Sequence, residues 1–334
     1  MKEKNAPPKI GISIGDYNGI GPEVIIKALL NSSVLERLTP IIYSSLQVIN
    51  YYKEQLKSDL QFEIIHSLDE AIGNKIYLYN AWNENVKIQP GIESKIAGQY
   101  AIKSLSMAVK HLKEERIDAI TTAPLSKDLV QSTDFSFPGH TEYLTTQAGS
   151  QESLMFLVHE SLRVGVVTGH IPLQKVSAAV TKEKVGKKLG IMLESLKTDF
   201  GKKNPRVAVL GLNPHAGEKG LLGYEEDETI APTIKDFQES GYLVDGPMPS
   251  DGFFGQGDYK TYDGILAMYH DQGLIPFKTL AFAEGVNFTA GLPFIRTSPD
   301  HGTAFGIAGK SIADEISFKN ALLLASRVAE NRAI

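Results

Sequence analysis

The sequence predicts an α/β fold made of two α/β domains. Short apolar runs of strand length alternate with longer segments of helical period along the whole chain. This alternation is typical of a largely parallel sheet with helices on both faces. At 334 residues the chain is also longer than one domain usually is, so two domains are expected.

Seven apolar runs are predicted to be buried strands. They are, in chain order, Lys9–Ile14, Pro40–Tyr43, Ile117–Ile120, Arg163–Val167, Val176–Val180, Arg206–Leu210 and Gly264–Met268. Two segments between them repeat apolar residues at steps of three and four, which predicts amphipathic helices with a buried face. These stripes are Ile102, Leu105, Val109 and Leu112, and then Val185, Leu189, Met192 and Leu196. No repeat, low-complexity segment or long linker marks a domain boundary.

The composition narrows the class of protein. Hydrophobic residues make up 42% and charged residues 22%, as in an ordinary globular chain, and the net charge of −5 gives no overall attraction to nucleic acid or an anionic membrane. The absence of cysteine excludes disulfides, thiolate metal ligands and cysteine nucleophiles. Met1 to Pro8 lacks the apolar core of a signal peptide, and no run approaches the roughly 20 apolar residues of a membrane span. A cytoplasmic location is therefore expected.

Three of the eight histidines follow apolar strand-like runs in glycine- or proline-marked loops: His170, His215 and His270. Ligands of α/β proteins collect at the carboxyl ends of strands, and three imidazoles there can hold a divalent metal with open positions. The separations of 45 and 55 residues exclude a local motif, so the fold must bring the ligands together. Asp271 is a further candidate ligand or a partner that orients an imidazole. Asp251 is either a site carboxylate or a simple turn residue.

Three other segments have both a functional and a structural interpretation. Gly15–Glu23 follows the first strand, but its spacing differs from a dinucleotide fingerprint and Asp16 would repel a pyrophosphate, so a tight turn and a ligand loop are equally favoured. The hydroxyls and the lysine of Thr121–Lys127 can hold an anion. Equally, the segment can be a helix cap followed by a solvated lysine. Phe137–Glu142 places His140 and Thr141 in a loop, where they are candidate binding residues or the start of a helix.

The C-terminal part supplies cations and a glycine-rich loop. Arg296, set between apolar residues and hydroxyls, is the best candidate to bind phosphate or carboxylate, with Lys278 and Asn287 as further candidates. Surface solvation is the alternative for Lys278. The segment Asp300–Lys310 is rich in glycine and alanine and can let a ring or phosphate approach the backbone, although alone it is a weak signal.

Taken together these segments closely resemble the 4-hydroxythreonine-4-phosphate dehydrogenases of pyridoxal phosphate (vitamin B6) biosynthesis. The resemblance runs from Lys9 to about Arg327, with one departure at Tyr17-Asn18, where the family usually has Pro-Ala. Its most specific parts are Gly15–Glu23, Phe137–Glu142, Leu212–Glu218, Tyr269–Gly273, Arg296–Ser298 and Asp300–Ala304.

The resemblance implies an isocitrate/isopropylmalate dehydrogenase-like fold and a homodimer whose subunits share the active site. It implies a first, cofactor-side domain of residues 8–135 plus 285–334, and a second domain of residues 136–284 that carries the metal ligands and dimer contacts. The implied metal ligands, for Zn, Mg or Co, are His170, His215 and His270. The implied substrate-binding residues are His140, Thr141, Lys278, Asn287 and Arg296, and the implied cofactor loop for NAD or NADP contains His301, Gly302, Ala304 and Gly309.

The implied reaction is a metal-dependent oxidation of 4-phosphohydroxy-L-threonine by NAD or NADP. The product, 2-amino-3-oxo-4-phosphooxybutanoate, decarboxylates to 3-amino-2-oxopropyl phosphate, with Asp251 and Asp271 as candidates for holding the amine or relaying a proton. A related dehydrogenase acting on erythronate or threonate 4-phosphate is the first alternative. A zinc hydrolase of phosphorylated metabolites and a non-enzymatic sensor are the others. Neither a nucleic acid nor a membrane is an expected partner.

Overall fold

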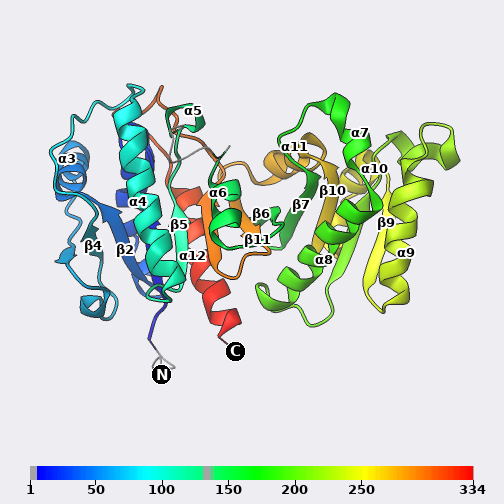
Figure 1. Cartoon of the computed structure of the whole chain (residues 1–334), viewed down its shortest axis with the longest axis horizontal. Coiled ribbons are helices and arrows are strands. Elements are labelled where there is room, and N and C mark those ends of the chain that lie inside the picture. Colours follow the sequence, from blue (N-terminus) through cyan, green and yellow to red (C-terminus); the bar gives the residue numbers. More distant parts are fainter. Residues whose placement is uncertain (1–5, 131–136, 138, 334) are drawn as a thin grey trace. The chain divides into compact units, whose positions relative to one another are not determined.

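The computed structural model describes residues 6–130, 137 and 139–333, and the chain divides into two compact units (Figure 1). Unit 1 comprises Met1–Ser150 and Leu292–Ile334, and unit 2 comprises Gln151–Gly291. Each unit is an α/β structure, as the sequence predicts.

Unit 1 is built on parallel strands in the order β3-β4-β2-β1-β5-β12. Buried β-branched residues run along its central strands, as parallel sheets covered on both faces require. The strands are β1 (Lys9–Ser13), β2 (Thr39–Ser44), β3 (Glu63–Ile65), β4 (Tyr77–Asn80), β5 (Ala119–Thr122) and β12 (Ile295–Pro299).

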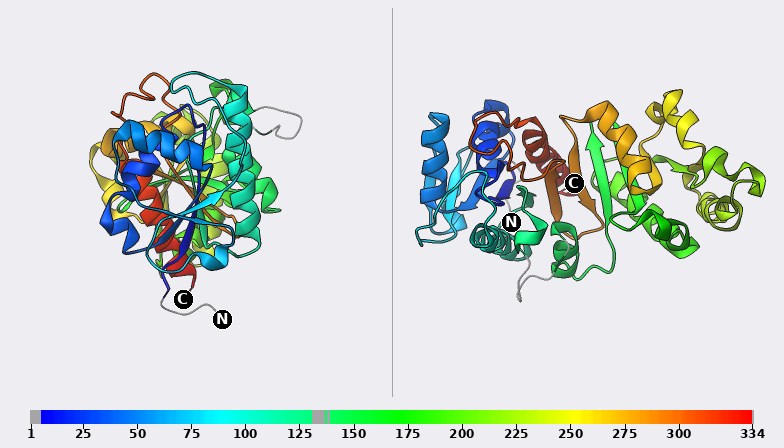
Figure 2. Two further views of the ribbon diagram at one scale, coloured as in Figure 1. Left: turned by 90° about the vertical axis from the view of Figure 1, so that its left-hand side faces the viewer. Right: turned by 90° about the horizontal axis from the view of Figure 1, so that it is seen from above.

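Helices cover both faces of this sheet. The longest, α4 (Lys95–Lys113), begins where Ser94 caps Ala97 N–H, and its predicted stripe of Leu105, Val109 and Leu112 is buried in one core. Figure 2 shows α4 on one side of the unit 1 sheet, with α1 (Gly21–Leu29) and α12 (Ile316–Arg332) on the other. The remaining helices are α2 (Ser32–Leu35), α3 (Leu46–Leu56), α5 (Lys127–Val130), α6 (His140–Gln147) and a 3₁₀ turn at Leu68–Glu70.

Unit 2 has the strand order β11-β6-β7-β10-β8-β9. Its last four strands are parallel, whereas β6 pairs antiparallel with both β7 and β11. The strands are β6 (Leu154–His159), β7 (Leu162–Thr168), β8 (Arg206–Leu210), β9 (Leu243–Met248), β10 (Gly264–Tyr269) and β11 (Val286–Ala290).

Two helices pack on opposite faces of the unit 2 sheet. Gly165 of β7 faces Met192 of α8 (Lys182–Thr198), whereas its neighbours Val164 and Val166 face Gly273 of α11 (His270–Ala281), and successive strand residues point to opposite faces. The other helices are α7 (Val176–Ala179), α9 (Ala231–Glu239), α10 (Ser250–Gly255), 3₁₀ turns at Leu173–Lys175 and Asp258–Thr261, and a π-helical turn at Glu226–Ile230, while Pro214–Gly220 forms a turn that contains left-handed residues.

Six of the seven predicted strands are confirmed within one or two residues of their expected ends. The seventh is wrong, because Val176–Val180 forms the short helix α7 and its C-cap. Only Val176 and Val180 of this segment are buried, and their four-residue spacing places them on one helical face. Among the described residues, no helix is both long and apolar enough to cross a membrane.

The boundaries of the compact units differ from the predicted domain cuts at 135/136, outside the described residues, and at 284/285. The chain divides after Ser150 and again after Gly291. Residues 139–150 belong to unit 1 because α6 buries Tyr143 and Leu144 in the core that also contains Leu105. Residues 285–291 belong to unit 2 because β11 pairs along its length with β6.

Gly273→Ala is expected to destabilise unit 2 by ~1–2 kcal/mol, despite the better helix propensity of alanine. A methyl group there would lie 2.9 Å from Val164 Cγ1 and 3.1 Å from Ala267 Cβ, so α11 must shift away from the sheet. Urea denaturation measures the effect. Gly255→Ala is the matched control because a methyl there meets nothing within 4 Å; equal effects of the two substitutions would contradict this packing.

Candidate active site

Four parallel strands of unit 2 deliver the predicted metal-site residues to one edge of the sheet. His170 follows β7, His270 follows β10, His215 follows β8 and Asp251 follows β9, and these strands are neighbours in the order β7-β10-β8-β9. Since their carboxyl ends share an edge, the loops that hold these side chains emerge side by side.

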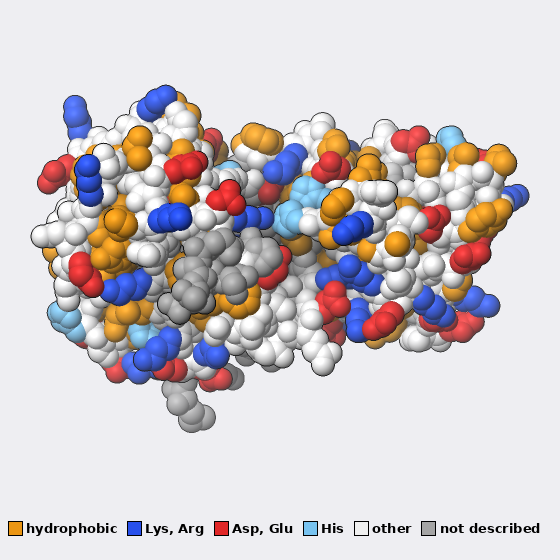
Figure 3. Space-filling model, turned by 45° about the horizontal axis from the view of Figure 1, so that its top comes forward, with side chains coloured by type: hydrophobic (Ala, Val, Ile, Leu, Met, Phe, Trp, Pro, Cys, Tyr) orange, Lys and Arg blue, Asp and Glu red, His pale blue; other side chains and the backbone are white. Residues whose placement is uncertain are grey.

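The imidazoles of His170 and His270 lie together, with ring centroids 5.4 Å apart. The Nδ1 atom of His270 is hydrogen-bonded to Asp271 Oδ1 at 2.7 Å. The Nε2 atom of the same ring is then the one that can bind a metal ion. His170 and His215 are both exposed. Figure 3 shows one group of histidine side chains, in pale blue, at the surface, and other histidines apart from it. Among the described residues, no three histidine or carboxylate side chains form a group that can hold a metal ion. Two of the three predicted ligands are thus brought together within one chain.

His215 lies in a left-handed turn. The φ angles of His215, Ala216, Gly217, Glu218 and Lys219 are all positive, from 46° to 81°. Left-handed backbone costs non-glycine residues roughly 1–2 kcal/mol each, so surrounding contacts must hold the turn in place.

Gln272 connects three of the loops at this edge. Its Oε1 atom accepts from Met268 N–H at 2.6 Å, and its Nε2 atom donates to Gly211 O at 2.5 Å and Ser250 Oγ at 2.7 Å. The hydroxyl of Thr168, the last residue of β7, donates to Met268 O at 2.8 Å and links the end of β7 to β10. The edge is therefore cross-linked by hydrogen bonds before any ligand binds.

The remaining predicted residues of unit 2 are distributed around its sheet. Asp251 is exposed in the first turn of α10, and Asp271 is exposed beside His270. Lys278 is partly buried in the last turn of α11. Asn287, the second residue of β11, has a buried Oδ1 atom with no hydrogen-bond partner among the described residues, so this acceptor is available to a ligand donor.

In unit 1, Arg296 of β12 is 3% exposed and lies beside the end of β5. Its Nη2 and Nε atoms donate to Thr122 Oγ1 at 2.9 and 3.2 Å. Burial lowers the pKa of Arg296 to about 10, opposed by the charge of Glu142, so the guanidinium remains cationic at neutral pH. A largely desolvated arginine of this kind binds phosphate or carboxylate strongly.

His140, the first residue of α6, belongs to the same group. Desolvation, followed by the charges of Arg296 and Lys127, holds the pKa of His140 well below its usual value. The imidazole is therefore neutral at pH 7, and can donate from one nitrogen and accept at the other. Thr141 follows it at a partly exposed position. The positive charges of Arg296 and Lys127 therefore lie close to the neutral His140, and this group of side chains in unit 1 has the chemistry to hold an anion.

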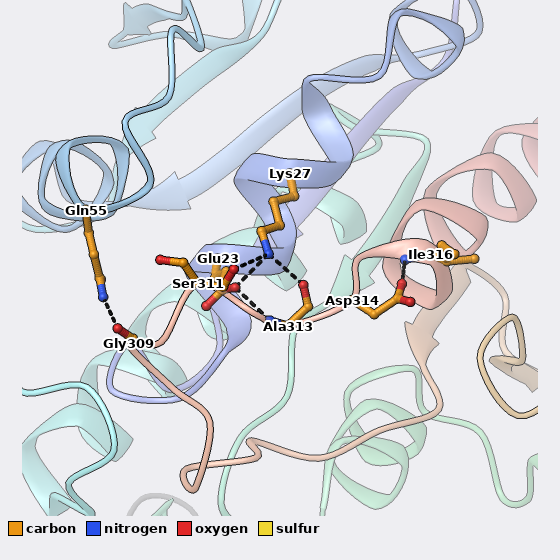
Figure 4. Close-up of polar contacts among 8 residues, drawn as sticks. All are labelled: Glu23, Lys27, Gln55, Gly309, Ser311, Ala313, Asp314 and Ile316. Carbon is orange, nitrogen blue, oxygen red and sulfur yellow. Dashed lines mark hydrogen bonds and ion pairs between the residues drawn. The ribbon is translucent and has the colours of Figure 1, made fainter.

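The predicted cofactor loop is tied to unit 1 at its C-terminal end (Figure 4). Gln55 Nε2 donates to Gly309 O at 2.5 Å. The carboxylate of Glu23 accepts from Ala313 N–H and from Lys27 Nζ, both at 2.8 Å, and Lys27 also donates to the carbonyls of Ser311 and Ala313. Gly302 and Ala304 are exposed, whereas His301 and Gly309 are partly buried. The loop is thus anchored while its glycine-rich part stays accessible.

The turn after β1 contacts the other side of this loop, because Ile20 N–H donates to Thr303 O at 3.0 Å. Asn18 is one of the two residues that differ from the usual Pro-Ala at this turn, and its side chain accepts from Gln89 N–H and donates to Ile92 O. The carboxylate of Asp16 is 1% exposed, with Oδ1 accepting from Asn18 N–H at 2.9 Å and Oδ2 lacking a partner among the described residues. Burial raises the pKa of Asp16 to about 6, and the charge of Glu93 adds to the rise.

Asp16→Asn is expected to stabilise the protein at neutral pH, by ~3 kcal/mol at most for a shift of about two pKa units. Because the folded-state pKa lies above the unfolded value, ionising Asp16 removes stability as pH rises from about 4 to about 6. Asparagine retains the Oδ1 acceptor and cannot ionise, so its advantage should be absent near pH 4 and complete above pH 6. Thermal unfolding across this range measures it. The exposed Asp59→Asn is the control, and a gain independent of pH would contradict the explanation.

Sequence reasoning left several contributing residues out of the predicted site. Lys127 and Thr122 belong to the Thr121–Lys127 segment, in which a cap and an anion site were equally favoured, and only the approach of β12 makes them part of the Arg296 group. Gln272 lies within the Tyr269–Gly273 segment, but its three hydrogen bonds join segments up to 61 residues apart, which no local pattern indicates.

Comparison with known proteins shows the family to which the chain is similar. Residues 36–325 match the model of a family described as pyridoxal phosphate biosynthetic protein PdxA. A 4-hydroxythreonine-4-phosphate dehydrogenase of Bacteroides thetaiotaomicron is 48% identical over 97% of this chain and 89% of its own length. A D-threonate 4-phosphate dehydrogenase of Cupriavidus necator is 40% identical over 98% of both chains.

Among solved structures, a 4-hydroxythreonine-4-phosphate dehydrogenase from Klebsiella pneumoniae is similar with a TM-score of 0.85. It is 36% identical and the match covers 98% of this chain and 99% of the other. The similarity in sequence and in structure therefore extends over both units.

Proposed function

Because the chain belongs to the pyridoxal phosphate biosynthetic protein PdxA family, we propose that it oxidises 4-phosphohydroxy-L-threonine with NAD or NADP. The product is 2-amino-3-oxo-4-phosphooxybutanoate, which decarboxylates to 3-amino-2-oxopropyl phosphate on the way to pyridoxal phosphate. The observation that carries this assignment is the buried Arg296, which donates to Thr122 Oγ1 and lies near His140, whose pKa is lowered first by desolvation and then by the charge of Arg296. A net-acidic protein that binds a phosphorylated substrate requires such a local cation.

His170, His215 and His270 would hold the divalent metal that the family implies. Their chemistry fits, since neutral imidazole is a common ligand of zinc and cobalt, and the Asp271 contact orients His270 with its Nε2 atom available. Magnesium prefers oxygen ligands and would depend more on the substrate and water. A bound cation supplies Lewis-acid polarisation of the substrate oxygen, and the nicotinamide supplies the hydride acceptor.

The chain's own residues bind and orient the substrate. Arg296 would hold the phosphate or carboxylate, with neutral His140 and the Thr141 hydroxyl as hydrogen-bonding partners. Lys278 and Asn287, whose Oδ1 atom has no hydrogen-bond partner among the described residues, would bind other groups of the substrate. Asp251 and Asp271 would hold the substrate amine or accept a proton, since both carboxylates are exposed at the carboxyl edge of the sheet. The cofactor would bind along the loop with His301, Gly302, Ala304 and Gly309.

A homodimer would complete the metal site with a histidine from the second copy. The pairing of His170 with His270, without a third grouped ligand among the described residues, supports this arrangement. Sedimentation of the active enzyme should therefore give a dimer, and full activity in a monomer would contradict a shared site.

The second candidate function is oxidation of D-threonate 4-phosphate, which the similarity to the Cupriavidus necator enzyme supports. Both substrates carry a phosphate, a hydroxyl and a carboxylate, so the same proposed substrate-binding residues suit either. The test compares initial rates of absorbance increase at 340 nm for 4-phosphohydroxy-L-threonine, D-threonate 4-phosphate and erythronate 4-phosphate, with NAD and with NADP.

We expect the highest kcat/KM with 4-phosphohydroxy-L-threonine. A preference for one of the other two would assign the chain to the alternative. Phosphate release without cofactor reduction would contradict both and favour a hydrolase.

A further inference from the structure

The buried carboxylate of Glu226 lies directly behind the turn that holds His215. Glu226 begins the π-helical turn before α9 and is 1% exposed. Its Oε1 atom accepts from the backbone N–H groups of Leu212 and Asn213, at 2.6 and 2.7 Å. Its Oε2 atom accepts from the Asn213 side chain at 2.9 Å. All three bonds therefore go to the two residues at which the His215 loop leaves the sheet.

Glycines make the space that this carboxylate occupies. A Cβ atom on Gly217 would lie 2.7 Å from Glu226 Oε2, and one on Gly211 would lie 3.1 Å from Oε1. Gly217 is also the middle residue of the left-handed run, with a φ of 81°. The Glu226 carboxylate thus packs closely against Gly217 at its Oε2 atom and against Gly211 at its Oε1 atom.

Neighbouring contacts extend this support to the next loop. Glu225 Oε2 accepts from Asn213 Nδ2 at 2.8 Å, and Glu225 Oε1 accepts from Ser177 Oγ at 2.5 Å. Ser177 lies on α7, seven residues after His170. Asn213 in turn accepts from Ala216 N–H at 3.1 Å through its carbonyl. Since a left-handed run persists only where its surroundings hold it, these bonds hold in place the turn that carries His215.

We propose that Glu226 is the positioning residue for His215: its buried carboxylate holds the left-handed turn and thereby sets the affinity of the site for a divalent cation. The inference rests on the proposed function, in which His215 is a metal ligand. Partners that orient a ligand without touching the metal typically change metal affinity 10–100-fold, and Glu226 should fall in this range.

The test titrates the full-length enzyme with Co²⁺ and follows its visible absorption, under conditions where every variant is folded by circular dichroism. Glu226→Gln preserves the shape but turns an amide group toward the Asn213 donor, so we expect a roughly 10- to 30-fold weaker Co²⁺ affinity. Glu226→Asp retains the charge and should recover part of this loss. If Glu226→Gln does not fold, Glu226→Asp serves as the measured variant.

Two comparisons separate positioning from general stability. Asp199→Asn removes another buried carboxylate of unit 2, one bonded to Ser195 Oγ, and should lower stability without changing Co²⁺ affinity. In a His215→Ala background, Glu226→Gln should cause no further loss of affinity, because Glu226 acts through His215.

The outcomes distinguish the two hypotheses. If His215→Ala weakens Co²⁺ binding and Glu226→Gln does not, the positioning role is wrong and the metal site stands. If the two losses add in the double variant, Glu226 does not act through His215. If His215→Ala leaves Co²⁺ binding unchanged, His215 is not a ligand and both proposals are overturned.

Discussion

His215→Ala is expected to lower kcat/KM by at least ~1,000-fold, about 4 kcal/mol of transition-state stabilisation. His215 is exposed at the carboxyl edge of the unit 2 sheet and its left-handed turn is held from behind, so the imidazole has no packing role that alanine would disturb. The loss should therefore appear in turnover and in metal content, and hardly in the free energy of unfolding. Steady-state kinetics and elemental analysis of the dialysed protein measure the two quantities.

His66→Ala is the control for His215→Ala, since it removes an exposed histidine from a loop of unit 1. It should leave both turnover and metal content unchanged. Near-normal turnover of His215→Ala without bound metal would overturn the metal-dependent mechanism. Loss of activity with full metal content would instead assign His215 a role in binding substrate.

The fold class followed from the sequence because parallel strands buried on both faces must be apolar along their whole length. Strands that break this rule were missed. β11 contains Asn287 and β12 contains Arg296, so neither strand has the continuous apolar sequence that predicts a buried strand. β6 is apolar, but it joins β7 through the two residues Glu160 and Ser161, and the expected alternation of strand and helix fails there.

The strand order of unit 2 explains which parts of the site could be predicted. Each histidine follows an apolar run, and that local fact was visible in the sequence. The pairing of β10 with β7 on one side and with β8 on the other is a long-range property. It decides that His170 and His270 meet, although they are 100 residues apart in the chain.

The same reasoning applies to residues that support the site without carrying its chemistry. Glu226 follows another acidic residue on a polar stretch, where a sequence pattern indicates only solvated charge. Its burial results from the approach of the loop after β8, whose N–H groups need an acceptor. Such residues become visible only once the hydrogen bonds of each loop are followed to their partners.

Arg296→Lys is expected to raise the KM for the phosphorylated substrate about 100-fold, equivalent to ~2.7 kcal/mol, while kcat falls much less. Lysine keeps the positive charge, so the substitution separates charge from geometry. It loses the planar fork that lets one guanidinium contact both Thr122 Oγ1 and an anion, and its shorter reach leaves a buried ammonium poorly solvated. The KM for NAD or NADP should change little, because the proposed cofactor loop does not depend on this side chain.

Arg163→Lys provides the matched control for Arg296→Lys. Arg163 is also buried, at 8% exposed, but its guanidinium donates to the backbone carbonyls of Glu160, Ser161 and Asp263 in unit 2. Its replacement should lower stability and leave the KM unchanged, whereas Arg296→Lys should raise the KM even where the protein is fully folded. Equal KM values for Arg296→Lys and the unmodified enzyme would show that the phosphate binds elsewhere, and the cation to test next would then be Lys278 of unit 2. An unchanged KM together with a lower kcat would instead place Arg296 beside the reacting carbons, because an interaction made only in the transition state appears in turnover.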